Sequence, residues 1–238
     1  MRTSLPLFLS LAVVFSVSPA IAQKPSVGAV HTHIDGIEVP TVANAPFTAK
    51  VVVVWNQPLV GGGTASRTYY TMVARDSEGR VRRETRGFVP TGSDAEPPLR
   101  SFTVLDPVAG TRTTCTKAWM TCATSAFDPN LELTRGFDAG QGNSSSESLG
   151  QQMIDGLSTT GTRETSWNAS GTRSASRLAL SHRDAWYSAD LRMDLSVTRD
   201  DPQAGEVTLD VTNLAQGEPD PRWFAIPAGY KVKDGRSQ

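Results

Sequence analysis

Cysteine is scarce in this sequence, with two residues among 238, and aromatic residues make up only 7%. Amphipathic helices are also missing, because no stretch repeats apolar residues convincingly at the 3.6-residue spacing of a helix face. The chain has no excess of either charge, since 23 Lys and Arg residues stand against 24 Asp and Glu residues. Such a balance predicts neither nucleic acid nor an anionic membrane surface as the main partner.

Recognisable catalytic motifs are absent as well. No G-x-S-x-G elbow for a nucleophilic serine occurs anywhere in the chain. Ser181, His182 and Asp184 contain the letters of a catalytic triad, but neighbours along a strand alternate sides and cannot converge. His31 and His33 have the spacing of two metal ligands, yet a third ligand is lacking and the segment reads as a flexible lead-in. We therefore predict a non-enzymatic protein without metal or cofactor.

The long apolar run that would suit a targeting segment stands at the N-terminus alone. Arg2 precedes an apolar run over residues 5–17, and Ala20–Ala22 has the small-residue pattern of a cleavage site. Residues 1–22 are therefore predicted to be a signal peptide. No later stretch approaches the ~20 apolar residues of a transmembrane helix. We expect export, cleavage near Ala22, a periplasmic or extracellular location, and no transmembrane segment in the mature chain.

Alternation of apolar and polar residues dominates the rest of the sequence. Residues 191–214 show it best, as two alternating runs joined by a turn with Pro and Gly, which is typical of an antiparallel hairpin with one apolar face. Similar runs predict about ten to eleven strands, including one over residues 151–158, and residues 136–148 are expected to form a polar loop. Because little helix is available to cover the apolar face, we expect an all-β fold with minor helix: a strongly bent antiparallel sheet, barrel or half-barrel. The predicted organisation is an extended lead-in over 23–45, a single β domain over 46–232 and a disordered tail over 233–238.

The two cysteines, Cys115 and Cys122, are separated by six residues. Pairing is the expected state of cysteines in an exported protein, because the compartment is oxidising. If Lys117–Met120 forms a four-residue turn, the two side chains face each other across neighbouring strands within disulfide reach. A structural disulfide is the favoured interpretation, and two free thiols are the main alternative. A redox pair is disfavoured because the spacing is not C-x-x-C.

Several motifs resemble an uncharacterised family of bacterial exported proteins. They are Leu149–Gly156, Gly161–Arg163, Trp186–Leu191, Asp201–Glu206 and Glu218–Tyr230, with Ala45–Phe47 and Arg75–Glu84 upstream. This resemblance spans most of residues 44–232 and implies no known activity. The order of strands, with a tryptophan-containing step between two of them, is also similar to the lipoprotein-carrier (LolA/RseB-like) half-barrel proteins of the periplasm. That second resemblance implies a half-barrel fold.

Two groups of side chains are candidates for a binding surface. Aromatic residues near strand ends either pack in the core or line an apolar groove; they are Trp186, Tyr187, Trp223, Phe224 and Tyr230. Arginines on one hairpin form either a solvated, salt-bridged surface or a docking patch for an acidic partner or a lipid head group; they are Arg75, Arg80, Arg82 and Arg83.

The leading hypothesis is an exported β-protein that binds an apolar ligand, a lipid or acyl chain, on one sheet face. The alternative is an envelope sensor or regulatory protein-interaction module that holds no ligand. The predicted partner is accordingly an apolar small molecule in the first case and an envelope protein in the second.

Overall fold

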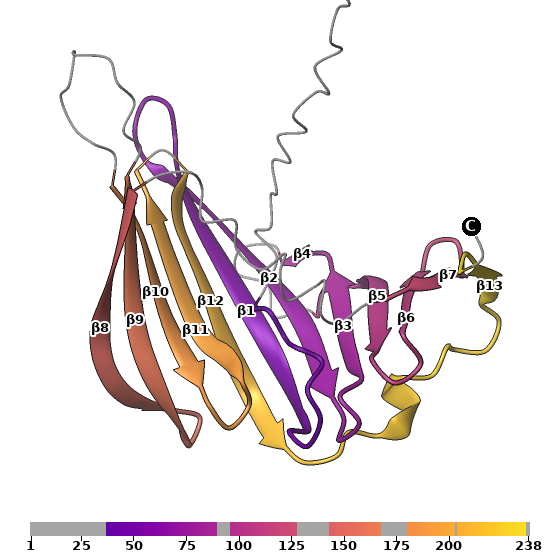
Figure 1. Ribbon diagram of the computed structural model, residues 1–238. Helices are drawn as coiled ribbons and strands as arrows, with labels where there is room; N and C mark the ends of the chain where they lie inside the picture. The colour runs from indigo at the N-terminus through magenta and orange to yellow at the C-terminus, as the bar shows by residue number, and fades with distance from the viewer. Residues whose placement is uncertain (1–36, 90–95, 128–142, 168–179, 203, 237–238) are drawn as a thin grey trace, which may run out of the picture. The chain divides into compact units, whose positions relative to one another are not determined.

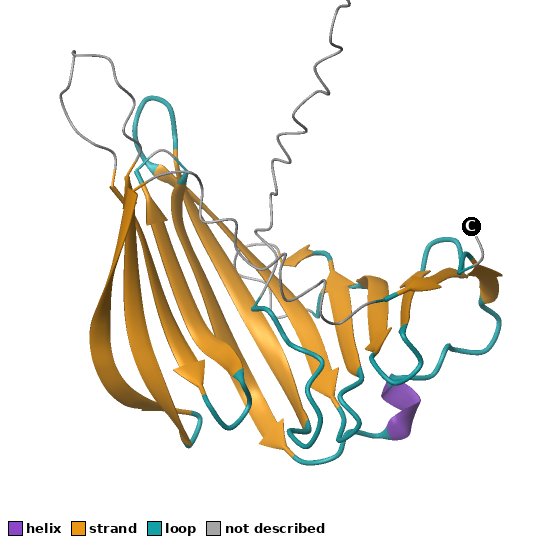
Figure 2. Ribbon diagram, viewed as in Figure 1, coloured by secondary structure: helices purple, strands orange, loops and turns teal. Residues whose placement is uncertain are grey.

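Strands make up almost all of the regular structure in the computed structural model. It describes residues 37–89, 96–127, 143–167, 180–202 and 204–236. Across those ranges a single 3-10 helix, η1 (Pro221–Trp223), accompanies thirteen strands (Figure 2). The all-β prediction with minor helix is confirmed. The predicted signal peptide over 1–22 and the histidines at 31 and 33 lie outside the described residues.

The strands alternate along the chain with short turns. In order they are β1 (Phe47–Pro58), β2 (Thr64–Arg75), β3 (Val81–Arg86), β4 (Phe88–Val89), β5 (Leu99–Asp106), β6 (Thr111–Thr116), β7 (Thr121–Ala126), β8 (Asn143–Ile154), β9 (Leu157–Trp167), β10 (Leu180–Ser188), β11 (Met193–Asp201), β12 (Gly205–Gln216) and β13 (Lys231–Asp234). Thirteen exceeds the predicted ten to eleven, because β4 and β13 are too short to show a pattern of alternation. β13 also continues to Asp234, two residues into the segment expected to be a tail.

All the strands belong to one open sheet. Their order is β13-β7-β6-β5-β3-β2-β1-β12-β11-β10-β9-β8, and β4 pairs with β2 away from this path. Every neighbouring pair is antiparallel except β7 with β13, which is parallel. β8 and β13 stand at opposite ends of the order and are not paired with each other (Figure 1). The predicted bent antiparallel sheet is thus confirmed in its open form.

Hairpin turns set the register between consecutive strands. The predicted hairpin over 191–214 is confirmed, with Asp201 opposite Gly205 where β11 turns into β12. Gly205 has φ of 91°, and a Cβ there would lie 2.1 Å from the carbonyl oxygen of Asn56 on β1. Only glycine fits, because the backbone of β1 passes too close for any side chain.

A second turn departs from the sequence prediction. Residues 151–158 were expected to form one strand, but Asp155 and Gly156 turn the chain between β8 and β9. Both residues have positive φ, at 47° and 79°, as a two-residue Asp-Gly hairpin turn requires. The polar residues 143–148, expected in a loop, are the first half of β8. They hold a strand because β9 supplies the backbone partners, not because their side chains are apolar.

The main core lies over the central strands. Val53 on β1, Leu209 on β12, Val197 on β11 and Ala185 on β10 lie opposite one another in register, and all four are buried. The complete main core is Ile37, Val39, Phe47, Ala49, Val51, Val53, Val73, Val81, Leu157, Ala185, Leu191, Met193, Leu195, Val197, Leu209 and Val211. Each large member contributes about 1.5–3 kcal/mol by its burial, so this core is the principal source of stability.

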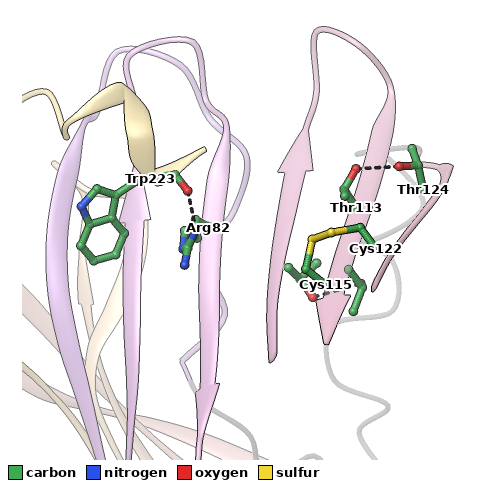
Figure 3. The surroundings of a disulfide bond; sticks show 8 residues. Arg82, Thr113, Cys115, Cys122, Thr124 and Trp223 are labelled. Atoms are coloured by element: carbon green, nitrogen blue, oxygen red, sulfur yellow. Dashed lines mark hydrogen bonds between the residues drawn. A yellow bond between two sulfur atoms is a disulfide. The ribbon is translucent and has the colours of Figure 1, made fainter. Parts of the chain in front are cut away.

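A smaller core lies toward the β13 end of the sheet. Its buried members are Phe102, Val104, Cys115 and Cys122, with Leu99, Phe224 and Tyr230 packed against them. Cys115 on β6 lies opposite Cys122 on β7, and the two are joined by a disulfide (Figure 3). The predicted disulfide and the four-residue turn between the cysteines are therefore confirmed.

Candidate functional site

Half-buried apolar side chains border the main core and are the first element of a candidate site. They are Tyr69, Leu105, Ile154, Val207 and Leu214. Tyr69 lies opposite Val53 and Val207 lies opposite Trp55, so both continue rows of the buried core toward solvent. A face that is buried at its centre and half-exposed at its border offers apolar surface without losing the packing that holds the sheet together.

Two of the predicted aromatic residues are neighbours on β10. Trp186 lies opposite Gly161 on β9, and a Cβ at position 161 would come within 2.5–2.8 Å of three carbons of the indole ring. The six-membered ring of Trp186 therefore covers the backbone of Gly161. Any side chain at position 161 would occupy the same space as this ring, so only glycine leaves room for it. Tyr187 follows at a register irregularity and remains 44% exposed. Ala185 and Ser188 on either side are buried.

The other three predicted aromatics lie at the small core. Tyr230 packs on Phe102 with ring centroids 6.3 Å apart. Trp223 ends η1, and its carbonyl oxygen accepts a hydrogen bond from the guanidinium of Arg82 at 2.7 Å (Figure 3). Phe224 lies beside Arg80, 5.1 Å from ring centroid to guanidinium. The five aromatics therefore form two groups, one on β10 and one at the small core, rather than one continuous lining.

Arg75, the first of the predicted docking arginines, is fully buried at the end of β2. Its guanidinium donates hydrogen bonds to the carbonyl oxygens of Ala45 at 2.8 Å, Pro40 at 3.0 Å and Leu191 at 2.6 Å. Burial lowers its pKa to about 10, aided by the positive charge of Arg192. Since that pKa is still far above neutrality, the side chain stays charged and ties the lead-in and the segment just before β11 to the sheet.

The remaining three arginines of that hairpin differ in exposure. Arg80 is ion-paired with Asp76 at 2.6 Å, and Arg82 is buried between Glu84 and the ring of Phe102. Arg83 is the one exposed member of the four. Three of these cations therefore have partners inside the fold, and the four do not form one exposed surface.

The serine, histidine and aspartate of β10 engage three separate partners. Ser181 donates to Asp201 at 3.0 Å, the Nδ1 atom of His182 lies 3.0 Å from the hydroxyl of Thr165, and Asp184 accepts from Arg163. The hydrogen bonds from Arg163 lower the pKa of Asp184. Ser181, His182 and Asp184 therefore do not act as a catalytic triad. Within the described ranges, no three His, Cys, Asp or Glu residues gather as metal ligands, and no helix is long and apolar enough to cross a membrane.

Sequence reasoning missed one exposed apolar feature. Trp119 and Met120 stand on the turn between β6 and β7, exposed by 76% and 47%. The available signal was a tryptophan inside a predicted four-residue turn, where a small polar residue is the usual choice.

Comparison with known proteins gives structural matches only. No family model and no curated protein matches the sequence. LprF from Mycobacterium bovis matches with 17% identity over 78% of this chain and 90% of its own, at a TM-score of 0.35. MucB matches with 14% identity over 79% of this chain and 60% of its own, at a TM-score of 0.36.

A LolA superfamily protein from Nitrosomonas europaea also matches, with 11% identity over 79% of this chain and 93% of its own, at a TM-score of 0.34. TM-scores of this size assign neither a family nor a function to the chain.

Proposed function

We propose that this protein is a non-enzymatic exported β-protein that binds an apolar ligand, such as a lipid or an acyl chain, beside its main core. The observation that carries the proposal is the continuous apolar row across β1, β12, β11 and β10 on an open, single sheet. In the described part of the chain, no second sheet and no long helix packs over this face.

The ligand site is the border of that face rather than its centre. The central side chains are each worth about 1.5–3 kcal/mol when buried, so they stay packed for the protein to fold. The border residues are only half-buried, and Tyr187 is exposed, so covering them with an acyl chain would remove apolar surface from water. We assign Trp186 and Tyr187 as ligand contacts. A polar metabolite would leave its hydrogen-bonding groups unpaired against such a surface.

Export is part of the same proposal. Residues 1–22 have the pattern of a cleaved signal peptide, and the Cys115–Cys122 disulfide suits an oxidising compartment. The alternative, a protein-interaction module centred on the arginine hairpin, draws less support, since Arg75 and Arg82 are buried and Arg80 is ion-paired.

A probe titration tests the proposed site. The mature chain, residues 23–238, is titrated with the apolar fluorophore N-phenyl-1-naphthylamine, and a fatty acid is then added as competitor. We expect saturable binding, displacement by the fatty acid, and a loss of about tenfold in affinity for Tyr187→Asp, because a charge cannot lie against the acyl chain. Trp119→Asp, an equally drastic change on an exposed aromatic at the other end of the sheet, is the matched control. Equal losses in both variants would contradict the assignment.

A further inference from the structure

The turn between β6 and β7 presents apolar side chains directly to solvent. Trp119 is 76% exposed and Met120 is 47% exposed. Met120 has φ of 46°, a left-handed conformation that Gly or Asn adopts at much lower cost. The Cε atom of Met120 lies beside Gly229, 3.2 Å from where a Cβ there would stand, so Trp119 is the side chain that this turn presents most fully to solvent.

The backbone of this turn is firmly held. The buried disulfide between Cys115 and Cys122 closes the hairpin directly behind it. On one side the amide of Lys117 donates to the carbonyl oxygen of Arg100 at 2.9 Å, and on the other the amide of Lys231 donates to that of Met120 at 2.9 Å. The disulfide and these hydrogen bonds therefore fix the backbone that carries the exposed Trp119.

Positively charged residues lie on the three segments whose backbones meet at this turn. Arg100, Lys117 and Lys231 are exposed, and none of them takes part in an ion pair with a described residue. Carboxylates elsewhere on the neighbouring segments are already occupied: Glu96 pairs with Arg86, Asp220 with Arg222 and Asp234 with Arg236. The tip therefore has a local excess of positive charge although the whole chain is nearly neutral.

We propose that this β6–β7 tip, defined by Arg100, Lys117, Trp119, Met120 and Lys231, docks on an anionic phospholipid surface. Tryptophan settles at the headgroup level of a bilayer, and each nearby Lys or Arg is attracted by anionic lipid. An acidic protein partner would match the charges but would leave the protruding Trp119 and Met120 without an apolar environment. The docking is local and reversible, and it goes beyond the proposed function because it needs no ligand on the sheet.

Vesicle binding tests the proposal with the mature, disulfide-bonded chain. Vesicles of phosphatidylcholine alone are compared with vesicles that also contain phosphatidylglycerol. We expect binding to the anionic vesicles only, weakened by salt, and reduced about fivefold for each of Lys117→Gln and Lys231→Gln. Trp119→Ser is expected to reduce binding roughly tenfold through loss of apolar area. In vesicles with brominated acyl chains, tryptophan fluorescence is quenched in the natural chain and not in Trp119→Phe, which keeps an apolar ring.

Two control variants distinguish binding through the tip from non-specific binding through other exposed apolar or cationic residues. Leu59→Ser with Val60→Ser removes apolar residues that are 51% and 108% exposed on the β1–β2 turn, and Arg83→Gln removes an exposed cation from β3. Both controls are expected to bind like the natural chain. Equal binding to neutral and anionic vesicles, unchanged binding of the tip variants, or quenching that survives in Trp119→Phe would overturn the proposal.

Discussion

Arg75 shows how one charged side chain can organise a sheet protein. It lies opposite Phe47 at the end of β2 and donates to three carbonyl oxygens from the lead-in and from the segment just before β11. The Pro40 carbonyl also accepts from the amide of Val42 at 3.0 Å, whereas the bonds to Ala45 and Leu191 are buried. The cost of burying a charge is offset by hydrogen bonds to the charged group, each worth about 1.5–3 kcal/mol.

Replacement of Arg75 is therefore expected to be severe. Arg75→Met keeps an unbranched side chain but removes the guanidinium that donates to Ala45, Pro40 and Leu191, and we expect the free energy of unfolding to fall by about 3 kcal/mol or more. Urea denaturation of the disulfide-bonded chain measures this. Arg83→Met, on the exposed side of β3, is the control and is expected to change stability by less than ~0.5 kcal/mol. A similar loss of stability for the two substitutions would show that the hydrogen bonds of Arg75 do not hold the lead-in and the segment before β11 in place.

The contact between Gly161 and Trp186 gives a second prediction at this scale. Gly161→Ala places a methyl group about 2.5 Å from the indole ring, so the ring must move, and we expect a loss of about 1–3 kcal/mol of stability. In a Trp186→Leu background the same substitution is expected to cost clearly less, as a double-mutant cycle would measure. Gly87→Ala, where the nearest atom would lie 3.6 Å away, serves as control. Additive effects of Gly161→Ala and Trp186→Leu would disprove the contact.

Alternation could not reveal the role of the arginines. Arg75 continues the face of β2 that carries Val73, so strict alternation places it toward the core, but arginine is so seldom fully buried that a surface position was the natural expectation. The carbonyl oxygens that hold it come from residues 40, 45 and 191, and no pattern in the sequence connects these positions. The grouping of the five aromatics depends in the same way on which strands become neighbours.

At the scale of elements, the sequence was sufficient to predict strand pairs where residues typical of a turn separated two alternating runs. The hairpin over 191–214 and the turn at Lys117–Met120 followed from alternation and from the cysteine spacing. β8 was harder because Asn143–Ser148 is polar throughout, so its strand conformation depends on pairing with β9. The Asp155-Gly156 turn was a readable signal that competed with an apparent strand over 151–158.

The disulfide gives a prediction for the β6–β7 hairpin. Cys115 and Cys122 close a short loop, for which the chain-entropy model gives a contribution of about 2–3 kcal/mol. Reduction, or the double substitution Cys115→Ser with Cys122→Ser, is expected to lower the melting temperature without abolishing folding, because the main core is untouched. Calorimetry of the oxidised and reduced chains measures the shift. Complete unfolding on reduction would mean that the small core is essential to the whole sheet.

At the scale of the whole molecule, the protein is one open sheet with two apolar clusters. The main core spans β1–β3 and β9–β12, whereas the small core depends on β5–β7, the disulfide and the segment that follows β12. The bent antiparallel sheet was predictable because alternating strands with little helix have few other ways to bury one face. Whether the sheet closes was not predictable, since closure depends on the pairing of its two end strands.

The central claim is that the sheet holds an apolar ligand beside its main core. Native mass spectrometry of the protein, purified without detergent from the envelope of the cells that make it, tests this most directly. The account predicts a population heavier than the polypeptide by the mass of a lipid or fatty acid, which solvent extraction recovers and which Tyr187→Asp removes while circular dichroism stays unchanged. Protein that is uniformly of polypeptide mass and yields no extractable lipid would contradict the claim.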